Sequence, residues 1–545
     1  MPLRILCLAF AALALLPIPV AAQDNAEAKP PALVVAIAVD QLSADLFAQY
    51  RRHFTGGLAR LASGAVFPSG YQSHAATETC PGHATILTGT RPARNGIVAN
   101  NWLDPASPRA DKRIYCAEDE RDARSSVRDP VVSAWHLKSP TLGTLMKRAD
   151  PRSRVVAVAG KDRSAMMLGG HNPDAVYWWN RSAFAMHEET ALPTPVERLN
   201  REIATRVTAG EAAYDVPAWC EAVDRPVRIG GFTIGRGRFA LAAGEAQGFT
   251  TSPRLDDATT DIAIAMIDAH ELGRDASPDV LALGLSATDY IGHAYGHEGA
   301  EMCIQLAALD MAIGRLFDAL DKRGIDYVAV LTADHGGLDA PERLQQQGYP
   351  QAARVSDLPD LAVIAAQASA QSGVAADTEP LLHGSAADIY IDAAVTGEDR
   401  ARLAAAAAGI VRAHPQVEAV HTRADLAATA IPEGSPQDWT LAQRLRASFD
   451  PVRSPDVQAV LKRGVVPFAA REGLTTTHGS PWDYDRRVPI AFWRAGITAM
   501  EQPNPVETVD IAPTLAALLR LALPDGTFDG RCLDIDAGAA DICRP

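Results

Sequence analysis

The clearest pattern along the chain is a series of short apolar runs, each followed closely by an aspartate. The three strongest runs and the residues after them are Ala32–Val39 with Asp40, Val280–Leu285 with Asp289, and Tyr327–Thr332 with Asp334. Continuous apolar runs of this length are typical of strands that are buried on both faces of a parallel sheet. The pattern therefore predicts buried parallel strands that deliver carboxylates at their carboxyl ends.

Helical patterns separate and follow these strands. Residues Asp257–His270 and Ala300–Leu320 have helical periodicity, and the chain later returns to a strand at Val488–Trp493 and a helix at Ala512–Leu521. Strands that alternate with helices indicate a doubly wound sheet, in which ligands bind at the carboxyl ends of the strands. We therefore predict an α/β fold with a doubly wound, mostly parallel central sheet flanked by helices.

Two stretches break this rhythm and are predicted to be insertions. Residues of about 172–254 are rich in Trp, Gly and Arg, contain hairpin-like sequence at Ile229–Gly244, and are expected to form a cap over the site. Residues of about 347–464 contain a short strand pattern at Ala387–Ile391 and an alanine-rich helix around Arg400–Ala413. This second stretch is expected to be a smaller α+β subdomain.

The first 22 residues have the features of a secretory signal peptide. Arg4 provides the positive start, Ile5–Leu16 the apolar stretch, and Val20–Ala22 a small-residue cleavage site. The run is short, and no later segment reaches the roughly 20 apolar residues that a membrane-spanning helix needs. We expect residues 23–545 to be the mature, periplasmic or secreted catalytic domain; an uncleaved anchor is the alternative.

The charge balance narrows the choice of partners. The 545 residues carry a formal net charge of −15, and loss of Arg4 with the signal makes it −15 − 1 = −16. An acidic surface repels phosphate backbones, so nucleic acid is not expected as a dedicated partner. A small anionic substrate would need local positive charge, which bound metal ions would supply.

Cysteine usage agrees with export. Of seven cysteines, Cys7 belongs to the signal, and the remaining six are an even number suited to disulfides. Cys532 and Cys543 bracket a short C-terminal segment and are the easiest pair to propose, whereas the sequence leaves the other pairings open. The chain has no C-x-x-C motif, which favours structural over metal-binding cysteines.

Six potential metal ligands are scattered along the chain: Asp40, Asp289, His293, Asp334, His335 and His478. Oxygen and imidazole ligands without clustered thiolates suit zinc or a similar ion, and paired ions of this kind recur in phosphoryl chemistry. A single aspartate after a strand is usually a turn or cap, and a lone histidine is usually packed or exposed. Only the joint occurrence of the six supports a two-metal site.

Thr79 is the candidate nucleophile. It stands two residues before Pro81, and proline is favoured in the first helical turn, so Thr79 is expected at a helix N-terminus. One interpretation is an ordinary N-cap threonine. The other is a hydroxyl at the positive end of a helix, where a phosphoryl group also binds, provided that a metal or base activates the hydroxyl.

These residues together resemble the alkaline phosphatase superfamily. The segments that carry the resemblance occur in the family's order and are Asp40, Thr79–His83, Asp289–His293, Ala333–Gly337 and Thr477–Gly479. Gly160–Arg163 after a predicted strand at Arg154–Val158, together with Asn100, is similar to the phosphate-irrepressible periplasmic alkaline phosphatases that use threonine. Sulfatases are disfavoured, because they need a modifiable Cys or Ser where this chain has Thr79.

The resemblance implies a role for each site residue. Asp289, His293 and His478 would hold one Zn²⁺; Asp40, Asp334 and His335, with the Thr79 hydroxyl, would hold the other. The two ions would activate Thr79 for attack on phosphorus and stabilise the leaving oxygen, so that a phosphothreonine forms and is then hydrolysed.

The resemblance also implies the substrate class. Asn100, Lys161 and Arg163 would contact the nonbridging oxygens, and the two cations would favour dianionic small-molecule monoesters over diesters. The expected function is therefore that of an alkaline phosphatase. Natural substrate and oligomeric state stay open.

Alternatives remain at the level of function and of single residues. A phosphodiesterase or nucleotide pyrophosphatase of the same fold, and a noncatalytic phosphate-binding relative, use the same scaffold. Lys161 and Arg163 are alternatively a solvated basic pair. The family pattern gives no ligand role to His297, and the expected role of His74 and His83 is packing around the nucleophile helix.

Overall fold

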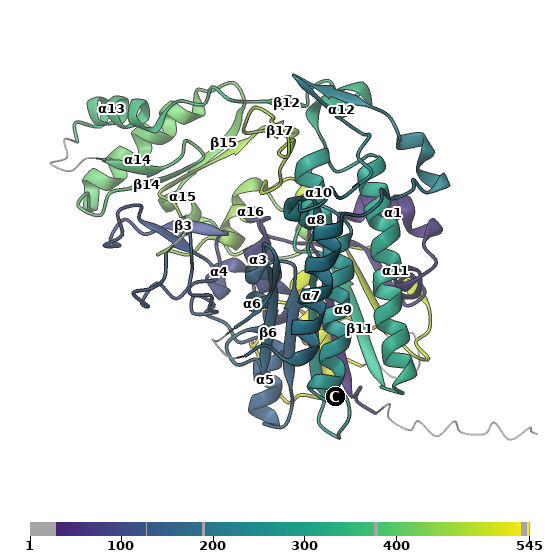
Figure 1. The fold of residues 1–545 in the computed structure, drawn as a ribbon. Coiled ribbons are helices and arrows are strands. Elements are labelled where there is room, and N and C mark those ends of the chain that lie inside the picture. Colours follow the sequence, from purple (N-terminus) through teal and green to yellow (C-terminus); the bar gives the residue numbers. More distant parts are fainter. Residues whose placement is uncertain (1–28, 127, 188–190, 375–379, 536–541, 544–545) are drawn as a thin grey trace, which may run out of the picture.

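The computed structural model describes residues 29–126, 128–187, 191–374, 380–535 and 542–543 (Figure 1). The predicted signal peptide, residues 1–22, lies outside these ranges. Within them, no helix is both long enough and apolar enough to cross a bilayer.

A ten-stranded sheet forms the centre of the molecule. Its five middle strands are parallel and lie in the order β11 (Tyr327–Thr332), β1 (Leu33–Val39), β10 (Asp279–Leu285), β5 (Val155–Ala159) and β6 (Ala175–Asn180). Val39 of β1 is paired with Leu285 of β10, and Ala38 with Thr332 of β11. The three strands therefore end at the same edge, as the sequence predicted.

The outer strands make the sheet mixed. β18 (Arg487–Arg494) is antiparallel to both β11 and β2 (Ala65–Tyr71), and β7 (Ala183–Met186) is antiparallel to β6. The short strands β19 (Met500–Glu501) and β20 (Val506–Glu507) add to β2. Strands β6 and β7 fall within the stretch assigned to the first insertion, so the sheet continues further than the sequence indicated.

Helices cover both faces of the sheet. The side chains of β1 show why apolar and polar residues do not alternate along this strand. Leu33, Val35, Ile37 and Val39 belong to one core cluster, whereas Val34, Ala36 and Ala38 belong to another. The first cluster includes α7 (Thr194–Ala209), α9 (Arg254–Ala269) and α11 (Ala300–Lys322); the second includes α3 (Thr79–Thr88), α5 (Leu142–Ala149), α6 (Asp162–Gly169) and α18 (Ile511–Leu518). A strand buried on both faces needs apolar residues at every position. The doubly wound α/β prediction is confirmed.

The first insertion packs against α11. The hairpin predicted within Ile229–Gly244 is confirmed only in its first part: β8 (Val227–Ile229) pairs with β9 (Phe232–Ile234), so the hairpin begins two residues earlier than predicted, and no strand follows between β9 and Gly244. Glu301 in the first turn of α11 accepts hydrogen bonds from the backbone N–H groups of Gly235 and Gly237. These hydrogen bonds fix the position of the loop that follows β9.

The second insertion forms the expected α+β arrangement (Figure 1). Strands β13 (Leu382–Gly384), β14 (Asp388–Ile391), β16 (Val457–Leu461) and β15 (Val417–Thr422) make a four-stranded sheet. Helices α13 (Leu361–Ser372) and α14 (Gly397–Arg412) pack on it around their own apolar cluster. We call residues 347–464 the subdomain below.

The remaining elements connect these layers. They are α1 (Ala44–Tyr50), α2 (Gly57–Ala62), α4 (Pro92–Asn95), β3 (Asn101–Leu103), β4 (Arg113–Tyr115), α8 (Ala246–Thr250), α10 (Ala287–Tyr295), α12 (Pro341–Gln346), β12 (Ala353–Arg354), α15 (Arg423–Ala428), α16 (Leu441–Ser448), β17 (Val465–Val466) and α17 (Asp483–Arg486), with four short 3₁₀ turns. Disulfides join Cys80 to Cys116, Cys220 to Cys303, and Cys532 to Cys543, the last being the proposed pair.

A buried carboxylate on α11 gives a test of this packing. Asp310 accepts hydrogen bonds from the backbone N–H groups of Thr55 at 2.7 Å, Gly56 at 2.7 Å and Leu58 at 2.8 Å, and so holds the start of α2. Asp310→Ala removes the acceptor of these three N–H groups and of the more distant Ala59 N–H at 3.4 Å, so we expect the free energy of unfolding to fall by about 3 kcal/mol in chemical denaturation.

The control lies on the same helix. The Asp318 side chain is 62% exposed and 3.6 Å from Arg60, so Asp318→Ala should change the stability by no more than about 0.5 kcal/mol. Similar losses in the two variants would show that Asp310 does not anchor α2.

Candidate metal centre and nucleophile

Three buried carboxylates meet at the carboxyl edge of the parallel strands. Asp40 directly follows β1, Asp334 lies two residues after β11, and Asp289 lies in the first turn of α10, which follows β10. All three are at most 3% exposed. The alignment of the strand ends therefore brings together residues that are up to 294 positions apart in the sequence, from Asp40 to Asp334.

The first predicted ligand set forms one cluster. The ligand atoms of Asp289, His293 and His478 all lie within 4.8 Å of one another. Nε2 of His293 and Nε2 of His478 are each 3.3 Å from Asp289 Oδ1. Asp289 and His293 are one turn apart on α10, which places them on the same helical face.

The second cluster is larger than predicted. Ligand atoms of Asp40, Asp334 and His83 lie within 4.8 Å of one another, and His335 Nε2 is 3.2 Å from Asp334 Oδ2. The imidazole rings of His335 and His478 stack with centroids 3.6 Å apart. The two clusters are therefore neighbours, as a two-metal site requires.

His83 was expected only to pack around the nucleophile helix, and this expectation is wrong. Its Nε2 is 3.2 Å from Asp40 Oδ1 and its Nδ1 is 3.4 Å from Asp334 Oδ2. Although burial opposes a charged imidazole, the two carboxylates raise the pKa of His83 to about 10. A signal was present, since His83 is one helical turn after Thr79 and shares its face.

Hydrogen bonds orient the three predicted histidine ligands alike. The Nδ1 atoms of His293, His335 and His478 lie 2.9, 2.8 and 2.7 Å from backbone carbonyl oxygens. An Nδ1–H that donates to a carbonyl leaves the Nε2 lone pair for a metal ion. Burial, together with the charge of His335, lowers the pKa of His478 to about 4, so its imidazole is neutral.

The clusters contain buried polar atoms that make no hydrogen bond: Asp40 Oδ1 and Oδ2, Asp289 Oδ1, Asp334 Oδ2 and His335 Nε2. The other oxygen of Asp334 accepts from the backbone N–H groups of Gln41 and His335, which leaves Oδ2 directed at the site. Buried polar atoms are normally hydrogen-bonded, and uncompensated buried carboxylates are costly. This oxygen and imidazole donor set fits divalent ions such as zinc.

The start of α3 brings Thr79 to the second cluster. Thr79 is the first residue of the helix, and Glu78 rather than Thr79 occupies the N-cap position. A Cβ atom on Gly82 would lie 2.1 Å from the carbonyl oxygen of Asp334, so only glycine permits this approach. The start of α3 therefore packs against the backbone of Asp334, and the Thr79 carbonyl oxygen lies 2.9 Å from Nδ1 of His83 in the second cluster.

The predicted phosphate-binding residues surround Thr79. Lys161 caps α6, and its Nζ is 2.6 Å from Asp289 Oδ2 and 2.9 Å from Asp40 Oδ2. Arg163 Nη2 donates to the Thr79 hydroxyl at 3.5 Å. Lys161 thus connects the two clusters, and it is a buried paired cation rather than part of a solvated basic pair.

The two other histidines lie outside both clusters. His297 is buried with Nε2 3.1 Å from the Ser43 hydroxyl, and His74 contacts the side chain of Gln72 at 3.1 Å. Both agree with the absence of a ligand role.

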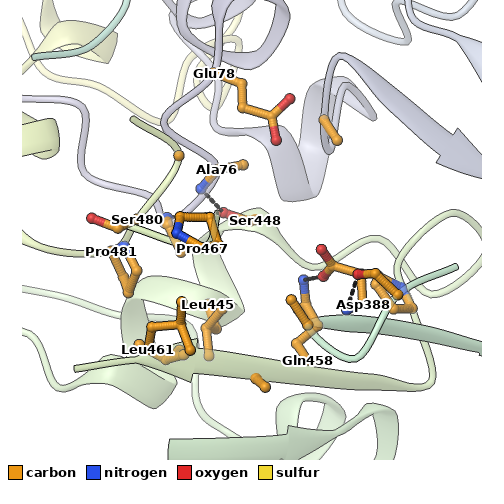
Figure 2. A pocket seen from close by; sticks show the side chains of 18 of the residues that line it. Ala76, Glu78, Asp388, Leu445, Ser448, Gln458, Leu461, Pro467, Ser480 and Pro481 are labelled. Atoms are coloured by element: carbon orange, nitrogen blue, oxygen red, sulfur yellow. Dashed lines mark hydrogen bonds between the residues drawn. The ribbon is translucent and has the colours of Figure 1, made fainter. Parts of the chain in front are cut away.

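A cleft of about 470 Å³ opens beside the site, between the core and the subdomain. Glu78 and His478 belong to its core side, and Asp388 and Gln458 to its subdomain side. Figure 2 shows the Glu78 and Asp388 carboxylates on opposite sides of this space. No described residue of the first insertion lines the cleft, so the second insertion covers the site where a cap was expected from the first.

Comparison with known proteins agrees with the geometry. Residues 34–481 match the family model for type I phosphodiesterase / nucleotide pyrophosphatase. Alkaline phosphatase PhoK of Sphingomonas sp is 51% identical, covering 95% of this chain and 93% of that protein, and alkaline phosphatase PhoD of Zymomonas mobilis is 46% identical, covering 94% and 89%. The crystal structure of alkaline phosphatase PafA superposes with a TM-score of 0.79 at 25% identity, covering 94% of this chain and all of that one.

The chain therefore belongs to the type I phosphodiesterase / nucleotide pyrophosphatase family within the alkaline phosphatase superfamily. Its high identity to phosphatases over nearly the whole chain makes it a phosphatase hydrolase. The family resemblance drawn from the motifs is confirmed.

Metal content tests the two clusters without measuring turnover. We expect zinc-loaded protein to contain about two ions per chain by elemental analysis, and Asp289→Ala or Asp334→Ala to contain about one. A ligand that binds only the folded state raises the melting temperature, so a chelator should lower it.

His421→Ala, in the subdomain, is the control and should keep both ions. If Asp289→Ala and Asp334→Ala retain the metal content of the unmodified protein, the assignment of the clusters as metal ligands is wrong.

Proposed function

We propose that this protein is an alkaline phosphatase that hydrolyses small phosphate monoesters through a phosphothreonine at Thr79, with two zinc ions as cofactors. The observation that carries the proposal is that two adjacent clusters of buried ligand atoms are bridged by one cation, Lys161, while a second cation, Arg163, donates to the Thr79 hydroxyl. Zinc ions held by Asp289, His293 and His478 and by Asp40, Asp334, His335 and Thr79 would supply positive charge for hydroxyl ionisation and for the leaving oxygen.

The protein's own residues account for the two chemical steps. Thr79 Oγ loses its proton and attacks phosphorus, the bond from phosphorus to the ester oxygen breaks, and the alcohol departs with a proton. Water then attacks the phosphothreonine, the Thr79–phosphorus bond breaks, and inorganic phosphate leaves. Because Thr79 begins α3, the positive end of the helix dipole favours the transferred phosphoryl group.

Lys161 and Arg163 supply the preference for monoesters. Arg163 is within 3.5 Å of the nucleophile, and its planar guanidinium suits two oxygens of one phosphoryl group. Lys161 lies between Asp40 and Asp289 and contributes a point charge. A monoester dianion has one more charge than a diester and gains more from both cations. The cleft beside Glu78 is the space for the leaving group.

We also infer that the protein acts in the periplasm or outside the cell. The three disulfides support this inference, because disulfides persist in oxidising compartments. A phosphodiesterase or nucleotide pyrophosphatase activity is the second candidate, favoured by the description of the matching family model.

Replacing the nucleophile tests the covalent mechanism. Thr79→Ala should lower kcat for an aryl phosphate by at least about 1,000-fold, because no protein oxygen is left to accept the phosphoryl group. Rapid acid quenching followed by mass spectrometry should find a phosphorylated peptide in the unmodified enzyme and in Thr79→Ser, and none in Thr79→Ala. Full turnover by folded Thr79→Ala would exclude a phosphothreonine.

Removing both cations tests the substrate class. Lys161→Ala/Arg163→Ala should lower kcat/KM for an aryl phosphate monoester at least about 30-fold more than for the matching methyl aryl diester, because charge-assisted hydrogen bonds are lost mainly from the dianion. Lys147→Ala/Arg148→Ala, a basic pair in the last turn of α5 whose Lys147 pairs with Asp174, is the matched control and should leave both values unchanged. Equal losses for the two esters would favour the phosphodiesterase.

A further inference from the structure

Asn100 is held by hydrogen bonds from both neighbours of the nucleophile. Its backbone N–H donates to Glu78 Oε2 at 2.8 Å, and its side-chain Oδ1 accepts from the backbone N–H of Cys80 at 2.7 Å. Glu78 and Cys80 flank Thr79 directly, so the position of Asn100 is tied to the position of Thr79 from two sides.

These bonds also fix which end of the Asn100 amide faces the site. An N–H donor such as that of Cys80 requires the oxygen of the amide, so the Nδ2 amino group is the end left over. Within the described part of the chain, Nδ2 makes no hydrogen bond to another residue. Its two donors are therefore available to a phosphoryl oxygen.

A disulfide links the segment that contains Asn100 covalently to the nucleophile helix. Cys80 is bonded to Cys116, which directly follows β4, and both cysteines are fully buried. The backbone N–H of Cys116 donates to the carbonyl oxygen of Asn100 at 3.0 Å. The hairpin of β3 and β4 begins directly after Asn100. The disulfide attaches its far end to Cys80, the residue next to Thr79.

The hairpin reaches the phosphate-binding arginine too. The hydroxyl of Tyr115, the last residue of β4, donates to Asp162 Oδ1 at 2.8 Å. The same oxygen accepts from the backbone N–H of Arg163 at 2.7 Å. One covalently closed hairpin therefore contacts the supports of both Asn100 and Arg163.

We propose that the Cys80–Cys116 disulfide, together with Glu78, is a positioning device that holds Asn100 against Thr79 in the orientation that binds a phosphoryl oxygen. The inference rests on the proposed function. Cys80, Cys116 and Glu78 are positioning residues, since they act through Asn100. Their effect is preorganisation: a donor held at the place where charge develops does not have to be ordered during the reaction, and a misplacement of about 1 Å costs about 100-fold in rate.

A double-mutant cycle separates positioning from general stability. Cys80→Ala/Cys116→Ala should lower kcat/KM for an aryl phosphate by about 10- to 100-fold and weaken the binding of inorganic phosphate, measured by calorimetry on zinc-loaded protein. In an Asn100→Ala background the same substitution should cost less than about 3-fold, because the group that it positions is gone.

The matched control is the Cys220–Cys303 disulfide, which joins the first insertion to α11. Cys220→Ala/Cys303→Ala should leave kcat/KM within about 2-fold of the unmodified value in both backgrounds. An equal loss from Cys80→Ala/Cys116→Ala with and without Asn100 would overturn the proposal, as would an unchanged kcat/KM. Loss of activity in proportion to unfolded protein would show a purely structural role and overturn it as well.

A second series of variants tests the positioning of Asn100 without changing a disulfide. Glu78→Gln keeps an acceptor for the Asn100 N–H and should retain most phosphate affinity, whereas Glu78→Ala should lose about 10-fold, and only when Asn100 is present. Equal affinities in Glu78→Gln and Glu78→Ala would contradict the proposal. Measuring phosphate binding also separates the positioning proposal from the proposed function. If phosphate binding depends on Glu78 and Asn100 but no ester is hydrolysed, only the proposed function is refuted.

Discussion

The structure depends on the concentration of negative charge at one edge of a buried sheet. Asp40, Asp289 and Asp334 are held in the protein interior by strands whose register aligns their carboxyl ends. Carboxylates in such a position are stable only when cations or hydrogen-bond donors compensate them. Lys161 provides one compensating charge and His83 another, and the remaining oxygen atoms without hydrogen bonds require further positive charge. The stability of the fold therefore depends on charge compensation at the same place where metal ions are proposed to bind.

The same constraint explains why the nucleophile lies on α3. A helix start can approach the charged edge only if its backbone comes close, and Gly82 allows contact with the backbone of Asp334. The helix begins at Thr79, so the positive end of its dipole lies at this negatively charged edge. Backbone carbonyl oxygens accept the hydrogen bonds that orient His293, His335 and His478, and these carbonyls are fixed by the main chain. Rigid main-chain groups thus determine most of the site geometry.

The sequence predicted those parts of the molecule that depend on local pattern. The runs before Asp40, Asp289 and Asp334 are strands because residues buried on both faces must all be apolar, and strand ends in a parallel sheet share an edge. The pairing of Cys80 with Cys116 depends instead on how α3 and the hairpin of β3 and β4 close in space. No local signal specifies such closure. For the same reason, the sequence did not indicate that β6 and β7 extend the sheet or that the first insertion leaves the cleft uncovered.

The sheet and the second insertion contribute different parts of the site, and this has a consequence for substrate specificity. The groups proposed to contact the phosphoryl unit come from the sheet edge, α3 and α6, whose positions are set by burial and register. The cleft for the leaving group lies between this core and the subdomain, so one of its walls comes from a separately packed unit with its own apolar cluster. Substitutions on that wall, at positions such as Asp388 and Gln458, do not disturb the core or the clusters of ligand atoms. A change of preferred alcohol is therefore expected from substitutions on this wall, whose residues lie outside the clusters of ligand atoms.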